Sequence, residues 1–262
     1  PVSEPSRAEQ ISSFTIIKGS LIDETYTAFC HWDLAQDSKA NLDRIQAEDP
    51  IGASSANWLR DIVRVLSRRF DPTGRDRPLV LLAQAGLDRQ RWAPLLLWHM
   101  TRDEFLVRDF FTRWLYTQYT AGTYRLHVEE VVAYVQDAVR SRPGAAQPWR
   151  PVTTARVAQG LLRMAVDFGL LRGTVAREFT RYRLPDESFL YLLYALYERT
   201  GNTRRTIAAE DWRLFLMDES DVERELFRLH QMHWLDYQVA GSLAQLSLPL
   251  ASAAEYAAEM VQ

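Results

Sequence analysis

One run of arginines offers most of the chemistry in this sequence. Between residues 140 and 183, nine arginines stand against two acids, Asp167 and Glu178, so the segment carries a local charge of +7. Arginine suits the recognition of phosphates and base edges, because its planar guanidinium donates paired hydrogen bonds. Only two of the 31 basic residues of the chain are lysines. A GC-rich genome and selection for phosphate recognition would both produce that bias.

The spacing of apolar residues places several polar groups on one face of a helix predicted over 153–168. Val157, Leu161 and Phe168 recur at helical spacing and form its inward face. Gly160 falls on the outward face, where it would allow a close approach of a backbone. Thr153 is the predicted N-cap, which would present free amide groups to a phosphate. The residues expected to contact a duplex from this helix and the loop before it are Arg150, Thr153, Thr154, Arg156, Gln159 and Arg163.

A hairpin is predicted directly after this helix. The runs 170–176 and 178–184 are rich in threonine and aromatic residues, and Pro185 closes the second run. A helix over 128–141 and a loop over 142–151 come first, so the order of elements is typical of a winged helix-turn-helix. The hairpin would be the wing that straddles a DNA backbone or enters a minor groove. Its candidate contact residues are Arg172, Arg177, Arg181 and Arg183.

A second unit of the same order follows, with the opposite charge. Residues 206–262 hold ten acids and three arginines, a local charge of −7. The predicted elements are a short helix over 208–217, a helix from a cap at Asp218 or Ser220 to Met232, and a hairpin of 234–240 and 242–248 that turns at Gly241. The second helix would expose acids that repel phosphates, namely Glu219, Asp221, Glu223 and Glu225. We interpret this unit as a protein-docking or self-docking surface.

The remaining segments predict helices. They cover 20–36, 54–70, 78–85, 88–100, a segment from a cap at Thr101 or Asp103 to Tyr119, a buried connector over 189–199 and a final helix over 251–262. The predicted fold class is therefore mainly α. It comprises a helical N-terminal domain (1–122), a basic winged helix-turn-helix unit with a small β-hairpin wing (123–185), and a connector helix with an acidic winged-helix-like unit (186–262).

A third surface is a row of arginines on the helix over 54–70 and its exit turn. Its members are Arg60, Arg64, Arg68, Arg69, Arg75 and Arg77. Arginines at this spacing form a solvated helix face or a second track for phosphates. The sequence leaves both interpretations open.

Signatures of an enzyme are missing from the sequence. It contains no phosphate-binding loop of the GxxxxGK[ST] type, no GxGxxG and no GxSxG. His230 and His233 lack the glutamate and third ligand of a zinc protease, and we expect both to serve packing. Cys30 and His31 are neighbours that point in different directions on a helix, so a buried thiol is expected at Cys30. We predict no enzyme, no catalytic residue, no metal, no cofactor and no small-molecule substrate.

Composition also bears on the compartment. The apolar runs are far shorter than the roughly 20 residues of a membrane span. The opening residues 1–10 are polar, unlike a signal peptide, and a lone cysteine makes no internal disulfide. We expect a cytoplasmic protein without membrane contact.

Several short motifs resemble the BrxA family, whose members are accessory components of BREX (bacteriophage exclusion) defence systems. The motifs are residues 14–22, Glu24-Thr25-Tyr26, Trp32-Asp33, Asn41-Leu42, residues 210–216, Gly241-Ser242 and Glu255-Tyr256. The resemblance implies a mostly helical, cytoplasmic protein with winged-helix elements that binds double-stranded DNA and has no enzymatic role. It also implies other BREX proteins as partners, including a methyltransferase and large ATPases.

Three hypotheses follow. The first is an accessory protein of phage defence that binds double-stranded DNA mainly through the charge of the DNA backbone. The second is an adaptor that holds the subunits of a defence complex without binding DNA itself. The third is a helical RNA-binding protein, which competition by single-stranded RNA would reveal.

Overall fold

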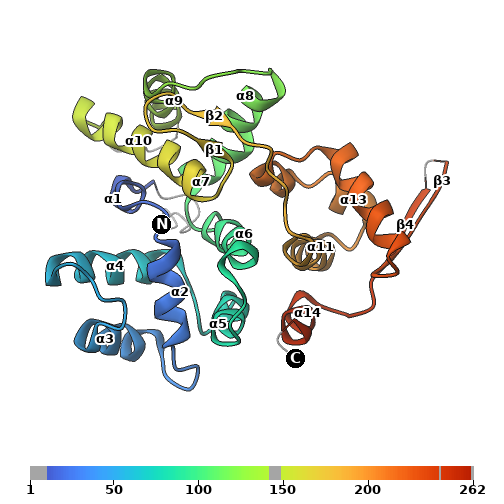
Figure 1. The fold of residues 1–262 in the computed structure, drawn as a ribbon, viewed down its shortest axis with the longest axis horizontal. Helices are drawn as coiled ribbons and strands as arrows, with labels where there is room; N and C mark the ends of the chain where they lie inside the picture. The colour runs from blue at the N-terminus through green and yellow to red at the C-terminus, as the bar shows by residue number, and fades with distance from the viewer. Residues whose placement is uncertain (1–10, 142–148, 242, 261–262) are drawn as a thin grey trace, which may run out of the picture.

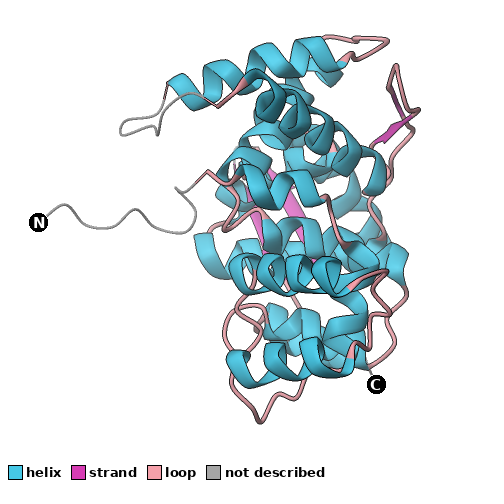
Figure 2. Ribbon diagram, turned by 90° about the vertical axis from the view of Figure 1, so that its left-hand side faces the viewer, coloured by secondary structure: helices cyan, strands magenta, loops and turns pink. Residues whose placement is uncertain are grey.

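A computed structural model describes residues 11–141, 149–241 and 243–260 of the 262-residue chain. Helices make up most of it, and the strands are short (Figures 1 and 2). The mainly α fold class and the two small antiparallel hairpins are therefore confirmed. None of the described helices is both long and apolar enough to cross a membrane.

The N-terminal half is a series of short helices. They are α1 (Ser13–Lys18), α2 (Ile22–Cys30), α3 (Ser38–Glu48), α4 (Ala56–Arg69), α5 (Arg77–Gln84) and α6 (Arg89–Met100). A helical rod follows, built of α7 (Phe105–Asp109), a π-helical turn η2 (Phe110–Leu115) and α8 (Tyr116–Thr120). The predicted helices over 54–70, 78–85 and 88–100 agree with α4, α5 and α6 to within two residues at each end.

The sequence prediction misses two helices here. Helix α1 is only six residues long, and α3 carries few apolar residues, so neither has a strong helical pattern. Helix α2 is shorter than predicted and begins after Leu21, which adopts a left-handed conformation. The predicted cap at Thr101 or Asp103 is wrong, because both residues are buried in the preceding turn and the N-cap is Glu104. Asp103 instead forms an ion pair with Arg75.

The basic unit consists of α9 (Val128–Arg140), α10 (Pro151–Asp167) and the hairpin of β1 (Leu171–Arg172) and β2 (Glu178–Phe179). An isolated antiparallel bridge between Leu126 and Arg177 adds a third short segment to the hairpin. The strands are much shorter than the predicted runs, because residues 173–177 form the turn. Gly173 has a φ of +99°, and a side chain there would lie 2.4 Å from the Ala176 carbonyl oxygen. Most of the predicted loop over 142–151, including Pro143, Gly144 and Pro148, lies outside the described residues.

The C-terminal part starts with the buried connector α11 (Asp186–Thr200), which confirms the helix predicted over 189–199. It continues with α12 (Thr203–Ile207), a 3-10 turn η3 (Glu210–Phe215) and α13 (Glu219–Gln231). The second hairpin, β3 (Asp236–Ala240) and β4 (Leu243–Ser247), and the short α14 (Ala253–Glu259) follow. The helix predicted over 208–217 is therefore only a 3-10 turn. Asp218 caps α13 as predicted, while Ser242 and Gln262 lie outside the described residues.

Buried polar side chains tie the N-terminal helices to the C-terminal part. His99 of α6 bonds Asp76 through Nδ1 at 2.6 Å and the hydroxyl of Tyr191 on α11 through Nε2 at 2.9 Å. Asp211 of η3 accepts hydrogen bonds from Trp98 and Arg199. The bonds His99–Tyr191 and Trp98–Asp211 join segments about a hundred residues apart in the chain, within one continuous cluster of buried apolar side chains.

Candidate nucleic-acid interface

Helix α10 presents the exposed polar face that its sequence predicts. Arg156, Gln159 and Arg163 are all exposed, while Val157, Leu161 and Met164 on the opposite side are fully buried. Neither Arg156 nor Arg163 forms an ion pair with a carboxylate in the described part of the chain. Both guanidinium groups therefore remain available to phosphate oxygens.

Two threonines of the same helix do not take their predicted places. The N-cap of α10 is Arg150, Pro151 occupies the first helical position, and Thr153 is a half-buried residue within the first turn. Thr154 is 3% exposed, and its hydroxyl donates to the Arg150 carbonyl oxygen. It lies on the apolar face because it precedes Val157 by three residues and Leu161 by seven. The prediction of base or phosphate contacts from Thr154 is wrong.

Gly160 faces another helix and not solvent. Helix α1 packs directly against α10 at this position, and a Cβ on Gly160 would lie 2.6 Å from the Ile16 carbonyl oxygen. The close backbone approach that the sequence suggested is therefore real, but the backbone belongs to this chain. As a result, α1 borders the exposed face of α10 (Figure 1).

Helix α1 is held in place by a buried arginine. Arg69, at the end of α4, is fully buried and donates hydrogen bonds to the carbonyl oxygens of Thr15, Gly19 and Ser20, at 2.8, 2.9 and 3.2 Å. Its Nε lies 3.5 Å from a carboxylate oxygen of Glu104. Arg69 is therefore not part of the exposed row of arginines that the sequence predicts. Three carbonyl groups and one carboxylate offset the cost of burying its charge.

The first hairpin neutralises part of its own charge. Glu178 on β2 accepts hydrogen bonds from Arg125 at 3.3 Å and from Arg172 at 3.2 Å, and these bonds, that from Arg125 first, lower the pKa of Glu178. Arg177 is half-buried where its backbone pairs with Leu126, and burial lowers its pKa. Arg172 is exposed as predicted, whereas Arg177 is less accessible than predicted.

The segment after β2 carries the last two predicted contact residues. Arg181 is exposed and forms no ion pair with a described carboxylate. Arg183 is exposed and lies 3.4 Å from a carboxylate oxygen of Asp186, at the start of α11. Apart from Thr153 and Thr154, which do not take their predicted places, the predicted contact residues separate into three groups: the exposed side and N-cap of α10, the hairpin and this exit segment.

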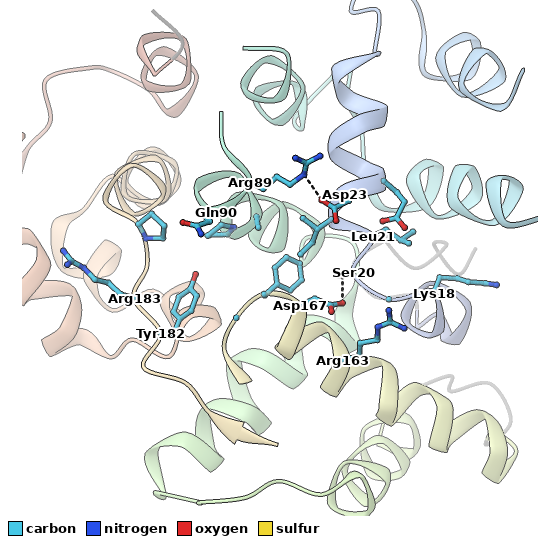
Figure 3. Close-up of a pocket in the computed structure, with 18 of the residues that line it drawn as sticks. Lys18, Ser20, Leu21, Asp23, Arg89, Gln90, Arg163, Asp167, Tyr182 and Arg183 are labelled. Carbon is cyan, nitrogen blue, oxygen red and sulfur yellow. Dashed lines mark hydrogen bonds and ion pairs between the residues drawn. The ribbon is translucent and has the colours of Figure 1, made fainter. Parts of the chain in front are cut away.

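A cleft of about 710 Å³ brings two of these groups together with residues that the sequence analysis missed (Figure 3). Arg163 from α10 and Arg183 from the exit segment line it, together with Lys18 of α1 and Arg89 of α6. Lys18 pairs with Asp61, and Arg89 pairs with Asp23 at 2.6 Å. On the wall formed by α10, Asp167 accepts a hydrogen bond from Ser20 at 2.6 Å.

Sequence reasoning missed Lys18 and Arg89 because they lie about 145 and 75 residues before Arg163 in the chain. Helix α1 brings Lys18 there, and its helical pattern is too short to detect. Lys18 is also one of only two lysines in the chain, which is the signal that could have drawn attention to it.

Two of the residues weighed for enzyme chemistry, His230 and Cys30, make local contacts within the fold. His230 Nδ1 accepts a hydrogen bond from the Tyr237 amide at 3.3 Å, a structural role at the start of β3. Cys30 is exposed, so the expectation of a buried thiol is wrong; it ends α2, and its Sγ lies 3.4 Å from the Ala83 carbonyl oxygen. Among the described residues, no cluster of His, Cys, Asp or Glu has the geometry of a metal site.

The geometry thus defines a mainly helical protein with a basic helix-and-hairpin unit. A family model described as BrxA matches residues 12–194, more than two thirds of the sequence, so the chain belongs to the BrxA family. Membership implies an accessory protein of BREX phage defence, with partners among the other BREX components. The resembling motifs over 210–216 and beyond fall outside the matched range. No curated protein and no solved structure matches the chain.

Proposed function

We propose that this protein binds double-stranded DNA through the exposed face of α10. The observation that carries the proposal is the pair Arg156 and Arg163, exposed one helical turn to either side of Gln159 and engaged with no described carboxylate. Arginine and glutamine are the side chains that contact phosphates, guanines and adenines in a major groove. The local charge of +7 over residues 140–183 supports attraction to the backbone.

The hairpin of β1 and β2 would act as the wing of a winged helix-turn-helix. It follows α10 directly, and the bridge between Leu126 and Arg177 fastens it to the segment before α9. Arg150, Arg172 and Arg181 are exposed around α10 and would add phosphate contacts. In this arrangement most contacts go to the backbone, so binding would depend little on base sequence.

The three predicted segments would divide the work of a non-enzymatic accessory protein. Residues 123–185 would contact DNA, residues 1–122 would support α10 through α1, and residues 186–262 would face other components of the defence system. Such a protein would act in the cytoplasm, where it meets both DNA and those components.

The test is a fluorescence-anisotropy titration of the purified protein with a random duplex of about 30 base pairs at several salt concentrations. Five phosphate contacts would give a slope of log affinity against log salt of about −4.5. The double variant Arg156→Glu/Arg163→Glu should lose binding, because each substitution places a negative charge against the backbone. A control variant, Arg205→Glu/Arg213→Glu, reverses the same number of exposed charges in the C-terminal part.

Two outcomes contradict the proposal. Wild-type protein that does not bind duplex even at low salt would exclude DNA binding. Equal losses in both double variants would show that general charge, and not the α10 face, governs binding. Circular dichroism of each variant establishes that it is folded, and competition with single-stranded RNA tests the RNA hypothesis.

A second candidate function, that of a protein adaptor, draws on a different surface. Phe227, Trp234, Val239 and Leu243 lie on or beside α13 and the second hairpin, and each is at least 40% exposed. Exposed apolar side chains grouped with acids are typical of a surface that contacts another protein. Co-purification with a BREX component that is lost in Phe227→Ser/Leu243→Ser would support this function. It is compatible with DNA binding by α10.

A further inference from the structure

A basic groove lies between α3 and α4, away from the hairpin. Its volume is about 910 Å³, and its charged lining residues are Lys39, Asp43, Arg60, Arg64 and Arg68. Four cations thus face one acid. Lys39 pairs with Asp43 at 2.6 Å, and Arg68 lies 3.9 Å from Glu104, so these charges are partly balanced.

The two remaining arginines have no such balance. Arg60 and Arg64 are both exposed, and neither forms an ion pair with a carboxylate in the described ranges. Arg60 donates a hydrogen bond to the neutral side chain of Asn57. The Arg64 guanidinium stacks over the ring of Phe14 on α1, 4.6 Å from its centroid. Arg64 is therefore directed from α4 onto α1.

Helix α1 connects this groove to the candidate DNA-binding face. It packs against α10 at Gly160 on one side, and it contacts α4 through Phe14 and Lys18 on the other. Figure 1 shows α1 between α10 and α4. Arg69 at the end of α4 donates hydrogen bonds to the carbonyl groups of Thr15 in α1 and of Gly19 and Ser20 directly after it, so α4 fixes the position of α1.

The packing of these helices keeps α4 within reach of a duplex that is bound at α10. Packed helices lie about 8–10 Å apart and α1 contacts both, so the axis of α4 is at most roughly 16–20 Å from that of α10. When α10 sits at the centre of a major groove about 12 Å wide, the backbones that border the next minor groove lie roughly 6 and 12 Å away. Arginines that extend from α4 toward α10 would meet these backbones.

We propose that Arg60 and Arg64 form a second phosphate-contacting surface, which binds the backbone of the same duplex that α10 engages. This inference rests on the proposed DNA binding by α10. It assigns to the N-terminal helices a direct part in binding, in addition to their support of α10. The expected ligand is the sugar-phosphate backbone, with no preference for base sequence.

The test compares wild type with Arg60→Gln/Arg64→Gln in the same anisotropy titration. Each lost phosphate contact lowers the salt slope by about one unit, so we expect a slope smaller by about two and weaker binding at every salt concentration. The control is Arg205→Gln/Arg213→Gln, because Arg205 is also exposed and Arg213 stacks over Tyr116, as Arg64 does over Phe14; Arg213 also lies 3.9 Å from Glu210. The control should keep the wild-type slope.

A stoichiometric titration establishes that one duplex covers both surfaces. One duplex per protein, with slope losses that add when Arg156→Gln/Arg163→Gln is combined with the α4 variant, supports the inference. Two duplexes per protein would overturn it, since the groove would then be a separate site. A wild-type slope in the α4 variant would overturn it too, while leaving the proposed role of α10 intact. Absence of binding by wild type would instead refute the proposed function itself.

Discussion

Single residues decide how the α10 face is bounded. Gly160 lacks a side chain, so α1 can lie against α10 and narrow the exposed strip to the line of Arg156, Gln159 and Arg163. Arg69 sustains the same contact from the other side of α1. The candidate interface is therefore shaped by two residues that never reach the surface.

The substitution Gly160→Ala should destabilise the protein. In a helix, alanine is more stable than glycine by about 1 kcal/mol. At this position, however, the Cβ of alanine would clash with the Ile16 carbonyl oxygen, and overpacking costs about 1–3 kcal/mol. We expect a net loss of up to about 2 kcal/mol in the free energy of unfolding, measured in urea. The control Gln159→Ala, on the exposed side of the same helix, should change it by less than about 0.5 kcal/mol. A stabilised Gly160→Ala variant would contradict this packing.

His99 should make the stability of the protein depend on pH. Burial lowers its pKa from 6.5 to about 4, although the carboxylate of Asp76 acts in the opposite direction. The unfolded chain therefore binds a proton between pH 6.5 and 4 that the folded protein does not bind. Stability falls as the pH drops through that range, and His99 alone should contribute a loss of about 2 kcal/mol between pH 7 and pH 5.

The measurement compares the free energy of unfolding of wild type and His99→Gln at pH 7, 6 and 5. The stability advantage of wild type over the variant should shrink by about 2 kcal/mol across this range, because glutamine does not titrate. A constant difference would show that His99 is accessible to protons in the folded protein.

At the scale of elements, the first hairpin is less basic than its sequence suggests. Glu178 engages Arg125 and Arg172 across the two sides of the hairpin, and Arg177 is half-buried at the bridge to Leu126. Exposed cation groups therefore concentrate on α10 and on the segment that leaves β2. The contribution of the hairpin to DNA binding depends on how firmly Glu178 holds its two arginines.

Neutralising Glu178 should strengthen DNA binding. In Glu178→Gln both Arg125 and Arg172 keep their charge and lose their carboxylate partner, so they can turn to phosphates. We expect a severalfold higher affinity and a salt slope steeper by one to two units in the anisotropy titration. The comparison variant Glu219→Gln removes one exposed acid of α13 and should leave the slope unchanged. Unchanged binding by Glu178→Gln would place the hairpin outside the interface.

At the scale of the whole molecule, one carboxylate joins the N-terminal and C-terminal parts. Asp211 of η3 accepts hydrogen bonds from Trp98 of α6, Arg108 of α7 and Arg199 of α11, at 2.8, 3.2 and 2.7 Å. Burial raises the pKa of Asp211, but the guanidinium groups of Arg199 and Arg108 more than offset this effect. They hold the pKa of Asp211 well below its usual value. The carboxylate stays charged and keeps four elements in register.

The substitution Asp211→Asn should weaken this junction while preserving its shape. Asparagine retains an acceptor for Trp98 but removes the charge that pairs with Arg108 and Arg199. We therefore expect the free energy of unfolding to fall by about 2–3 kcal/mol. Thermal melting followed by circular dichroism checks the loss. Asp218→Asn, at the exposed cap of α13, is a suitable control and should change stability by much less, since asparagine is also a good cap. Equal effects of the two substitutions would contradict a central role for Asp211.

Much of the fold follows from local patterns in the sequence. The apolar stripes of α4, α9 and α10 are long and regular, so the burial of one face determines each of these helices, whereas α11 is apolar and buried on nearly every side. The outward side chains of α10, Arg156, Gln159 and Arg163, follow from the same periodicity. Glycines and prolines mark the ends of these elements correctly, because their backbone preferences act locally.

Tertiary structure alone decided the rest. Helical spacing places Thr154 and Gly160 beside Val157 on the apolar face, but a threonine and a glycine there do not show by themselves that other helices cover them; the packing of α1 against α10 determines the burial of Gly160. Helical spacing places Arg69 beside Ile62, Val65 and Leu66, yet the sequence does not show what would accept its hydrogen bonds. The acceptors are the carbonyl groups of Thr15, Gly19 and Ser20, about fifty residues earlier in the chain. The sequence by itself determines which faces are polar. Contacts between segments far apart in the chain decide which of those polar groups remain at the surface.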